Sequence, residues 1–301
     1  MGTRSCFGKG SPGCAAGRCV MVFSEPAWLQ RALSREADLA FRRRVRAVLE
    51  YVTPQPGDRI LDCGCGRGFY LLFIGRLEPA CTLYGADMDP AVLALARRHL
   101  PPTVHLLHSD AVHLPFPAGF FDKVICSEVL EHLPDDRAGL QELRRVLKPA
   151  GVLAITVPNA DYPFWWDPVN KTREALGVGP VRKGFWAGIW ANHVRLYRQE
   201  ELVARVQEAG FLVENVRRFT HYCLPFTHNI VYGFGKEALE RGWLPKGLTR
   251  QADRFDYADA PPSPWNPITW GLALFDLVDR LNDRAAGKRT YVNLALKARR
   301  A

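Results

Sequence analysis

The chain has 301 residues, and 48% of them are hydrophobic, so it can bury a sizeable core and is not disordered throughout. Its formal net charge is +9, and the basic surplus falls outside residues 51–150. The sequence contains no dense Lys/Arg run and no basic stripe interleaved with aromatic residues. Composition therefore gives no strong argument for a nucleic-acid partner.

The first segment, residues 1–24, is a leader rich in Gly and Ser that lacks the apolar stretch of a signal peptide. We expect it to be disordered, with Met21 as an alternative start to Met1. The eight cysteines of the chain do not form the dense pattern of a small secreted scaffold. This usage favours a reducing, cytoplasmic compartment.

After the leader, helix and strand patterns follow one another along the chain. An apolar stripe predicts a single helix over 25–52, ended by Pro54. Short apolar strands then alternate with helices. The predicted strands are 59–63, 82–87, 103–110, 121–127, 151–159, 211–219 and 290–299, and the predicted helices between them are 69–77, 90–100, 135–147 and 198–210.

This alternation predicts an α/β fold, with a doubly wound, Rossmann-like, mostly parallel sheet covered by helices on both faces. We expect residues 25–219 together with 288–301 to form the main domain. Residues 220–287 would be a helical, aromatic-rich insertion between the last two strands. In such a sheet, ligands bind at the carboxyl ends of the strands.

A glycine-rich loop lies at the first of these strand ends. The stretch RILDCGCGRGFYLLF, residues 59–73, places Gly64, Gly66 and Gly68 between a strand and a helix. Bare backbone and exposed amides at this point suit a bound nucleotide, and a tight turn without ligand is the alternative. The spacing G-x-G-x-G, with Phe69 where a dinucleotide fold has its third glycine, disfavours NAD.

Acidic residues follow the next two strands. Asp87 ends the second strand, where a carboxylate can accept both hydroxyls of a ribose. The alternative role, a helix N-cap, suits Asp89 before Pro90 better. Asp110 ends the third predicted strand and is placed to receive an adenine amino group. The sequence therefore predicts one nucleotide crevice at this edge of the sheet.

Five segments in order, ILDCGCGRG, GADMDP, SDAVHLPFP, FDKVICSEVLEHL and LRRVLKPAGVLAITVPN, resemble the successive motifs of class I S-adenosylmethionine-dependent methyltransferases of the type-11 group. The resemblance implies a seven-stranded sheet with an antiparallel last strand and helical lid insertions. It also implies S-adenosyl-L-methionine as cofactor and methyl transfer as the reaction. The implied cofactor-binding residues are Asp62, Gly64, Cys65, Gly66 and Gly68 for the first strand and loop, Asp87 and Met88 for the ribose, Asp110 and Ala111 for the adenine, and Ser127 below the sulfonium.

Two histidines are candidates for a general base, which methyl transfer needs only when the acceptor is a hydroxyl or an acidic carbon. His132 follows the fourth strand and His193 follows the fifth, so both loops open on the cofactor face. A packed or capping histidine is the alternative for each.

A metal site is an alternative use of the same region, although we assign no metal. If EVLEH is helical, then Glu128, Glu131 and His132 share one face, and His193 could complete a set of ligands for a divalent ion. The pattern E-x-x-E-H resembles that of quinone-pathway O-methyltransferases and of small-RNA 2′-O-methyltransferases. The stretch V-L-E-H-L, however, also occurs widely in relatives that are not thought to need a metal.

The acceptor should bind the two irregular segments that follow the fifth and sixth strands. Seven of the eight tryptophans fall there, and they suit a lid core or a hydrophobic, lipid-like or quinone-like acceptor. The stripe Ile268, Leu272, Phe275 and Val278 and nearby basic residues, Arg217 and Arg218 among them, favour peripheral membrane contact. An RNA 2′-O-methyltransferase and a non-catalytic S-adenosylmethionine-binding protein are the alternatives. The sequence gives no oligomeric state.

Overall fold

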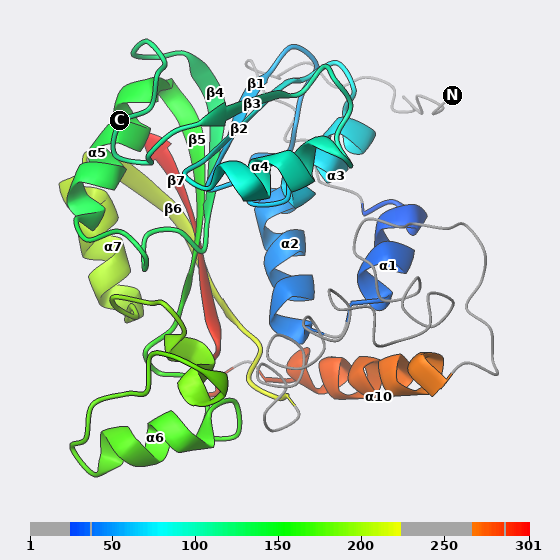
Figure 1. The fold of residues 1–301 in the computed structure, drawn as a ribbon, viewed down its shortest axis with the longest axis vertical. Coiled ribbons are helices and arrows are strands. Elements are labelled where there is room, and N and C mark those ends of the chain that lie inside the picture. Colours follow the sequence, from blue (N-terminus) through cyan, green and yellow to red (C-terminus); the bar gives the residue numbers. More distant parts are fainter. Residues whose placement is uncertain (1–24, 37, 224–266, 286) are drawn as a thin grey trace, which may run out of the picture.

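A single mixed sheet forms the centre of the computed structural model, which describes residues 25–36, 38–223, 267–285 and 287–301. Within these residues the sheet has seven strands in the order β3-β2-β1-β4-β5-β7-β6 (Figure 1). β1 to β5 run parallel, and β7 pairs antiparallel with both β5 and β6. The strands are β1 Arg59–Cys63, β2 Thr82–Asp87, β3 His105–His108, β4 Phe121–Ser127, β5 Leu147–Pro158, β6 Phe211–Phe219 and β7 Asn293–Arg300.

The strand order confirms the predicted fold class. From β1 the chain moves outward through β2 to β3, and it then returns to the other side of β1 to form β4. The carboxyl ends of β1 and β4 therefore flank the point where the winding direction changes, which is where open α/β sheets bind ligands. The glycine loop follows β1 directly.

Helices cover both faces of the sheet. α2, α3 and α4 lie on one side in Figure 1, and α5 and α7 lie on the other. Neighbouring residues of β1 point to opposite faces of the sheet and enter different cores. Ile60 packs in the core on the α2 side, and Leu61 packs in the core on the α5 side. The helices are α1 Ala27–Ser34, α2 Leu39–Val52, α3 Phe69–Leu77, α4 Pro90–Arg97, α5 Asp136–Val146, α6 Pro168–Ala175, α7 Gln199–Glu208 and α10 Pro267–Asn282, with a short 3₁₀ helix η1 over Phe185–Trp190.

The single helix predicted over 25–52 is wrong, because the chain forms two helices there, α1 and α2. Asp38 has an extended backbone, and its carboxylate accepts the Phe41 amide at 3.0 Å. It therefore acts as the N-cap that begins a new helix. The apolar residues on both sides, such as Leu33 and Val45, still enter one core, which is why their spacing resembled one stripe.

The described part of the insertion between β6 and β7 comprises residues 220–223, 267–285 and 287, and α10 packs beside α2. Arg42 of α2 pairs with Asp276, while Arg43 contacts Asp279 at 2.5 Å and Asp283 at 2.7 Å. These ion pairs fix the rotation of α10 about its axis. No described helix has the length and apolar character needed to cross a bilayer. The predicted disordered leader and residues 224–266 of the insertion lie outside the described residues.

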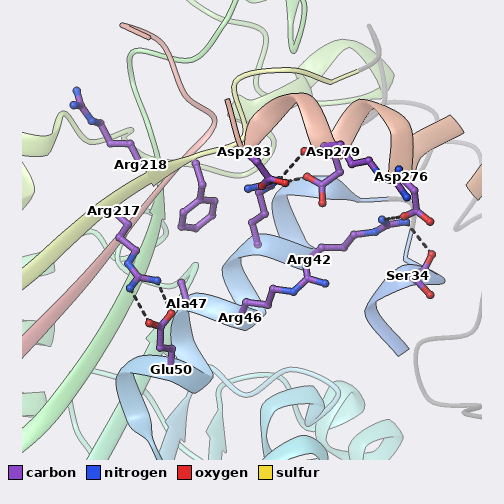
Figure 2. Close-up of a pocket in the computed structure, with 13 residues that line it drawn as sticks. Ser34, Arg42, Arg46, Ala47, Glu50, Arg217, Arg218, Asp276, Asp279 and Asp283 are labelled. Carbon is purple, nitrogen blue, oxygen red and sulfur yellow. Dashed lines mark hydrogen bonds and ion pairs between the residues drawn. The ribbon is translucent and has the colours of Figure 1, made fainter. Parts of the chain in front are cut away.

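A polar pocket of about 740 Å³ lies between α2, α10 and the end of β6 (Figure 2). Six arginines and four carboxylates line it, and most of them pair across it. Arg217, for example, contacts Glu50 through both of its terminal nitrogens. None of the predicted cofactor residues lines this pocket. We interpret it as the ion-paired seam that joins α10 to the main domain.

Candidate functional site

The glycine loop leaves β1 and doubles back over the end of β2. The amides of Gly64 and Cys65 both donate to the Ala86 carbonyl, at 2.7 and 3.0 Å. Gly66 has a φ of +53°, a backbone conformation that residues other than glycine rarely adopt. A Cβ added there would meet nothing within 4 Å, whereas one at Gly64 would lie 2.3 Å from Val129. The loop therefore leaves open space at Gly66.

Asp87 ties this loop to the end of β2. Its Oδ2 accepts the Gly66 amide at 2.8 Å, and its Oδ1 accepts the Asp89 amide at 3.0 Å. Each carboxylate oxygen has a second lone pair, so both can still receive a hydroxyl from a ligand. The side chain of Met88 is 70% exposed beside it. Asp87 thus shapes the loop in addition to the ribose role predicted for it.

Asp110 lies two residues past the end of β3, at the same edge of the sheet. Its Oδ1 accepts the Val112 amide at 3.1 Å, which closes a local turn around Ala111. Ala111 itself packs against the core on the α5 side. The carboxylates of Asp87 and Asp110 therefore follow neighbouring parallel strands, as predicted.

Asp62 is buried within β1, with only 1% of its surface exposed. Its Oδ2 has no hydrogen-bond partner in the described part of the chain. Burial, and secondarily the nearby Asp87 carboxylate, raise the pKa of Asp62 to about 8. Burying a carboxyl oxygen without a hydrogen-bond partner destabilises the folded state unless a ligand supplies that partner. The neighbouring Cys65 thiol is also buried, and this burial raises its pKa, so it is not a thiolate nucleophile.

Hydroxyl groups form a connected row at the carboxyl end of β4. Ser127 Oγ lies 3.1 Å from the Tyr70 hydroxyl and 2.8 Å from Thr156 Oγ1. Thr156 in turn donates to Glu128 Oε1 at 3.0 Å. Ser127 was predicted for the floor of the site, whereas Tyr70 was not predicted. The signal for Tyr70 was its place one residue after the start of the helix that follows the glycine loop.

Glu128 is held away from the predicted metal set. Residues 128–133 form turns rather than a helix, and Glu128 has a φ of +57°. The i, i+3, i+4 argument is therefore wrong here. The carboxylate of Glu128 accepts a 2.8 Å ion pair from Arg44 of α2, and Asn293 of β7 lies 3.4 Å away. Arg44 and Asn293 come from the two ends of the chain, so local motifs could not identify them.

Glu131, His132 and His193 do come together. One ligand atom from each lies within 4.8 Å of the other two, and the two imidazole rings meet edge to face at 4.7 Å. Glu131 is fully buried, and neither of its carboxylate oxygens has a hydrogen-bond partner within the described ranges. Burial, and then the charge of Glu128, raise the pKa of Glu131 well above its usual range.

The hydrogen bonds of the two rings set their tautomers. His132 Nδ1 lies 3.1 Å from the Asn192 carbonyl, and His193 Nδ1 contacts the Ile189 carbonyl. A carbonyl oxygen can only accept, so Nδ1 carries the proton in both neutral rings and Nε2 carries the lone pair. His193 Nε2 lies 3.9 Å from Glu131 Oε1. The cluster can therefore accept a proton or bind a cation.

Comparison with known proteins agrees with this geometry. Residues 61–155 match the family described as a methyltransferase domain. The chain is 38% identical over 141 residues to the demethylmenaquinone methyltransferase of Thermus thermophilus, an alignment that covers 44% of this chain and 63% of that relative. Residues 61–155 therefore form a methyltransferase domain, and the chain is similar to class I S-adenosylmethionine-dependent methyltransferases of the type-11 group. The predicted fold is confirmed by the strand order, and the domain match supports the predicted family and the predicted cofactor, S-adenosyl-L-methionine.

Two further comparisons define how far the likeness extends. The chain is 28% identical over 221 residues to the 2-methyl-6-phytyl-1,4-hydroquinone methyltransferase 1 of Oryza sativa, an alignment that covers 71% of this chain and 58% of that relative. The solved structure of the [4+2]-cyclase SpnF aligns over 86% of this chain and 80% of its own, with a TM-score of 0.52 and 22% identity, and shows a shared fold. The chain spans about three fifths of the length of the first curated relatives it matches.

The segment after β5, for which the sequence predicts a lid role, has a core of its own. Tyr162, Trp166 and Ile189 are buried together there, and the Trp165 indole donates to the His221 carbonyl at 2.7 Å. These aromatic residues therefore serve as lid core, which was one of the two alternatives. Trp186 is 51% exposed. Trp243 and Trp265 lie outside the described residues.

Proposed function

We propose that this methyltransferase transfers a methyl group from S-adenosyl-L-methionine to a hydrophobic, quinone-like small molecule. The names of two relatives refer to a demethylmenaquinone and to a phytyl hydroquinone, which supports this acceptor class. The loop at Gly66 is the observation that carries the proposal, because it joins bare backbone, open space and the Asp87 carboxylate in one place.

The crevice offers each part of the cofactor a group of suitable chemistry. We assign the loop from Gly64 to Gly68 to the methionine part, Asp87 to the ribose hydroxyls and Asp110 with Ala111 to the adenine. The unsatisfied Oδ2 of Asp62 needs a positive or donating partner, and the α-ammonium group of the cofactor is one. These residue roles stay predictions.

The reaction asks the chain mainly for alignment and for exclusion of water. The bound cofactor supplies an electrophilic methyl group carried on sulfur. Ser127 and Tyr70 place hydroxyl groups at the end of β4, where they can orient the acceptor or the cofactor. Nε2 of His193 carries a lone pair and can accept the proton of a phenolic hydroxyl as that oxygen is methylated.

The test is turnover with candidate acceptors. Purified full-length protein is incubated with methyl-labelled S-adenosyl-L-methionine and a panel of naphthols, alkylated hydroquinones, polar catechols and RNA. We expect S-adenosylhomocysteine to form, with label in the hydroquinone or naphthol fraction. Label only in RNA would favour the 2′-O-methyltransferase alternative, and cofactor binding without S-adenosylhomocysteine would favour the non-catalytic alternative.

A metal-assisted form of the same reaction is the second candidate, and Glu131 is the observation that favours it. A buried carboxylate without a hydrogen-bond partner beside two imidazoles suits Zn²⁺, Mn²⁺ or Fe²⁺. Each imidazole also donates its Nδ1–H to a carbonyl, as metal-bound histidines commonly do. Glu131, His132 and His193 would hold the ion, which would polarise the hydroxyl of the acceptor.

Metal analysis distinguishes the two candidates. Calorimetric titration with Mn²⁺ and Zn²⁺ should show one site, which Glu131→Gln removes and His105→Gln keeps. If chelator-treated protein retains full turnover and titration gives no heat, the metal-free form stands. The reducing compartment expected from the cysteines stays a prediction.

A further inference from the structure

Helix α10 is apolar on two opposite sides, and the outward side is not the one predicted from the sequence. Leu272, Phe275 and Val278, expected to face a partner, are half-buried. The exposed apolar residues lie on the other side, at spacings of four, three and four residues. They are Trp270 at 69% exposure, Leu274 at 49%, Leu277 at 60% and Leu281 at 46%.

The charged residues of α10 are sorted between these sides. Its carboxylates, Asp276 and Asp279, and the following Asp283 turn toward α2, where Arg42 and Arg43 bind them (Figure 2). The ion pairs prevent α10 from rotating to hide its leucines. The outward stripe therefore contains no acidic residue.

Basic residues continue the outward stripe at its carboxyl end. Arg280 follows Leu277 by three residues and also lines the polar pocket beside α2, whereas Arg284 follows Leu281 by three residues and shares its exposed side. Both arginines are exposed, and neither forms an ion pair with any residue in the described ranges. Lys288 and Arg289 are exposed beyond them.

We propose that α10 docks this methyltransferase onto an anionic lipid bilayer, lying in the plane of the membrane with its outward stripe in the headgroup layer. A helix with an apolar stripe, a tryptophan and flanking arginines has the composition that inserts there. Charge complementarity decides between the occupants. A second copy would bring the same acid-free, basic surface against itself, whereas anionic headgroups neutralise Arg280 and Arg284.

The surface differs from the basic patch expected from the sequence. Arg217 belonged to that patch, but Glu50 binds its guanidinium. The stripe on α10 instead combines exposed apolar area with arginines that form no ion pair among the residues that the structure describes. This docking would place the methyltransferase beside a membrane pool of apolar molecules, but it depends on no particular acceptor.

Cosedimentation with vesicles tests the proposal without measuring methyl transfer. Full-length protein is mixed with phosphatidylcholine vesicles and with phosphatidylcholine–phosphatidylglycerol vesicles. We expect binding to the anionic vesicles, weakened by salt and reduced about tenfold or more by Leu274→Glu with Leu277→Glu. Leu212→Glu, at an exposed leucine of β6, is the matched control and should bind as the unchanged protein does.

A second measurement needs no disruptive substitution. Brominated phospholipids in the anionic vesicles should quench part of the tryptophan fluorescence, and Trp270→Phe should remove that part. The proposal is overturned if the unchanged protein stays in the supernatant with anionic vesicles, or if the double glutamate variant binds as well as the control. Self-association in sedimentation velocity that the double variant abolishes, without vesicle binding, would assign the stripe to a second copy instead.

Discussion

The Gly66 amide donates a 2.8 Å hydrogen bond to Asp87 Oδ2, so the acid predicted for the ribose also holds the glycine loop in place. Loop shape and ribose recognition thereby depend on one carboxylate. A substitution at either residue should change cofactor affinity more than it changes folding.

Gly66→Ala should make the free energy of cofactor binding less favourable by more than it lowers the free energy of unfolding. The added methyl group meets no protein atom, and the positive φ costs about 1 kcal/mol of folding free energy. The methyl group would occupy the open space that we assign to the cofactor. Calorimetric titration with S-adenosylhomocysteine measures this, and Gly57→Ala is the control because it has a φ of +84° and equally open surroundings. Equal affinities in the two variants would contradict the assignment.

Asp87→Asn should lower affinity for S-adenosylhomocysteine about tenfold or more. The amide keeps one acceptor oxygen for the loop but loses the charge and one of the two acceptors available to the ribose. The affinity for 2′-deoxy cofactor analogues should fall less than the affinity for the parent. An unchanged affinity for the parent nucleotide would show that Asp87 serves the loop alone.

The raised pKa of Asp62 predicts a pH-dependent stability. Between about pH 4 and pH 8 the folded state keeps the proton on Asp62 while the unfolded state releases it, so this residue's contribution to stability is lost as the pH rises toward 8. The slope is at most about 1.4 kcal/mol per pH unit. Asp62→Asn should flatten the pH dependence of urea unfolding, and parallel curves for both proteins would contradict the assigned pKa.

His193→Gln should reduce turnover about a hundredfold while leaving cofactor affinity nearly unchanged. Glutamine cannot accept a proton from the acceptor, whereas the crevice at Gly66 and Asp87 is unaltered. Steady-state kinetics and calorimetry separate these effects, with His105→Gln as the control. A variant that retains full turnover toward a hydroxyl acceptor would remove His193 from the mechanism.

The sequence predicted the sheet well, and it placed the glycine loop and the strand-end acids at one edge, because apolar strands, glycine loops and strand-end acids are local patterns. It failed where long-range contacts decide the outcome. EVLEH has helical composition, yet Glu128 has a φ of +57° and pairs with Arg44, 84 positions earlier in the chain. Likewise, the rotation of α10 follows from Arg42 and Arg43, so the exposed stripe could not be predicted from α10 alone.

The ion pair between Arg44 and Glu128 also bears on where this domain can be cut. The segment that matches the methyltransferase family begins after α2, so a fragment trimmed to that segment would lose the guanidinium that neutralises a carboxylate next to Ser127. Chimeras that exchange this segment between relatives should therefore carry α2 with it. Otherwise the graft would carry the Glu128 carboxylate, next to the predicted sulfonium site, without the arginine that pairs with it.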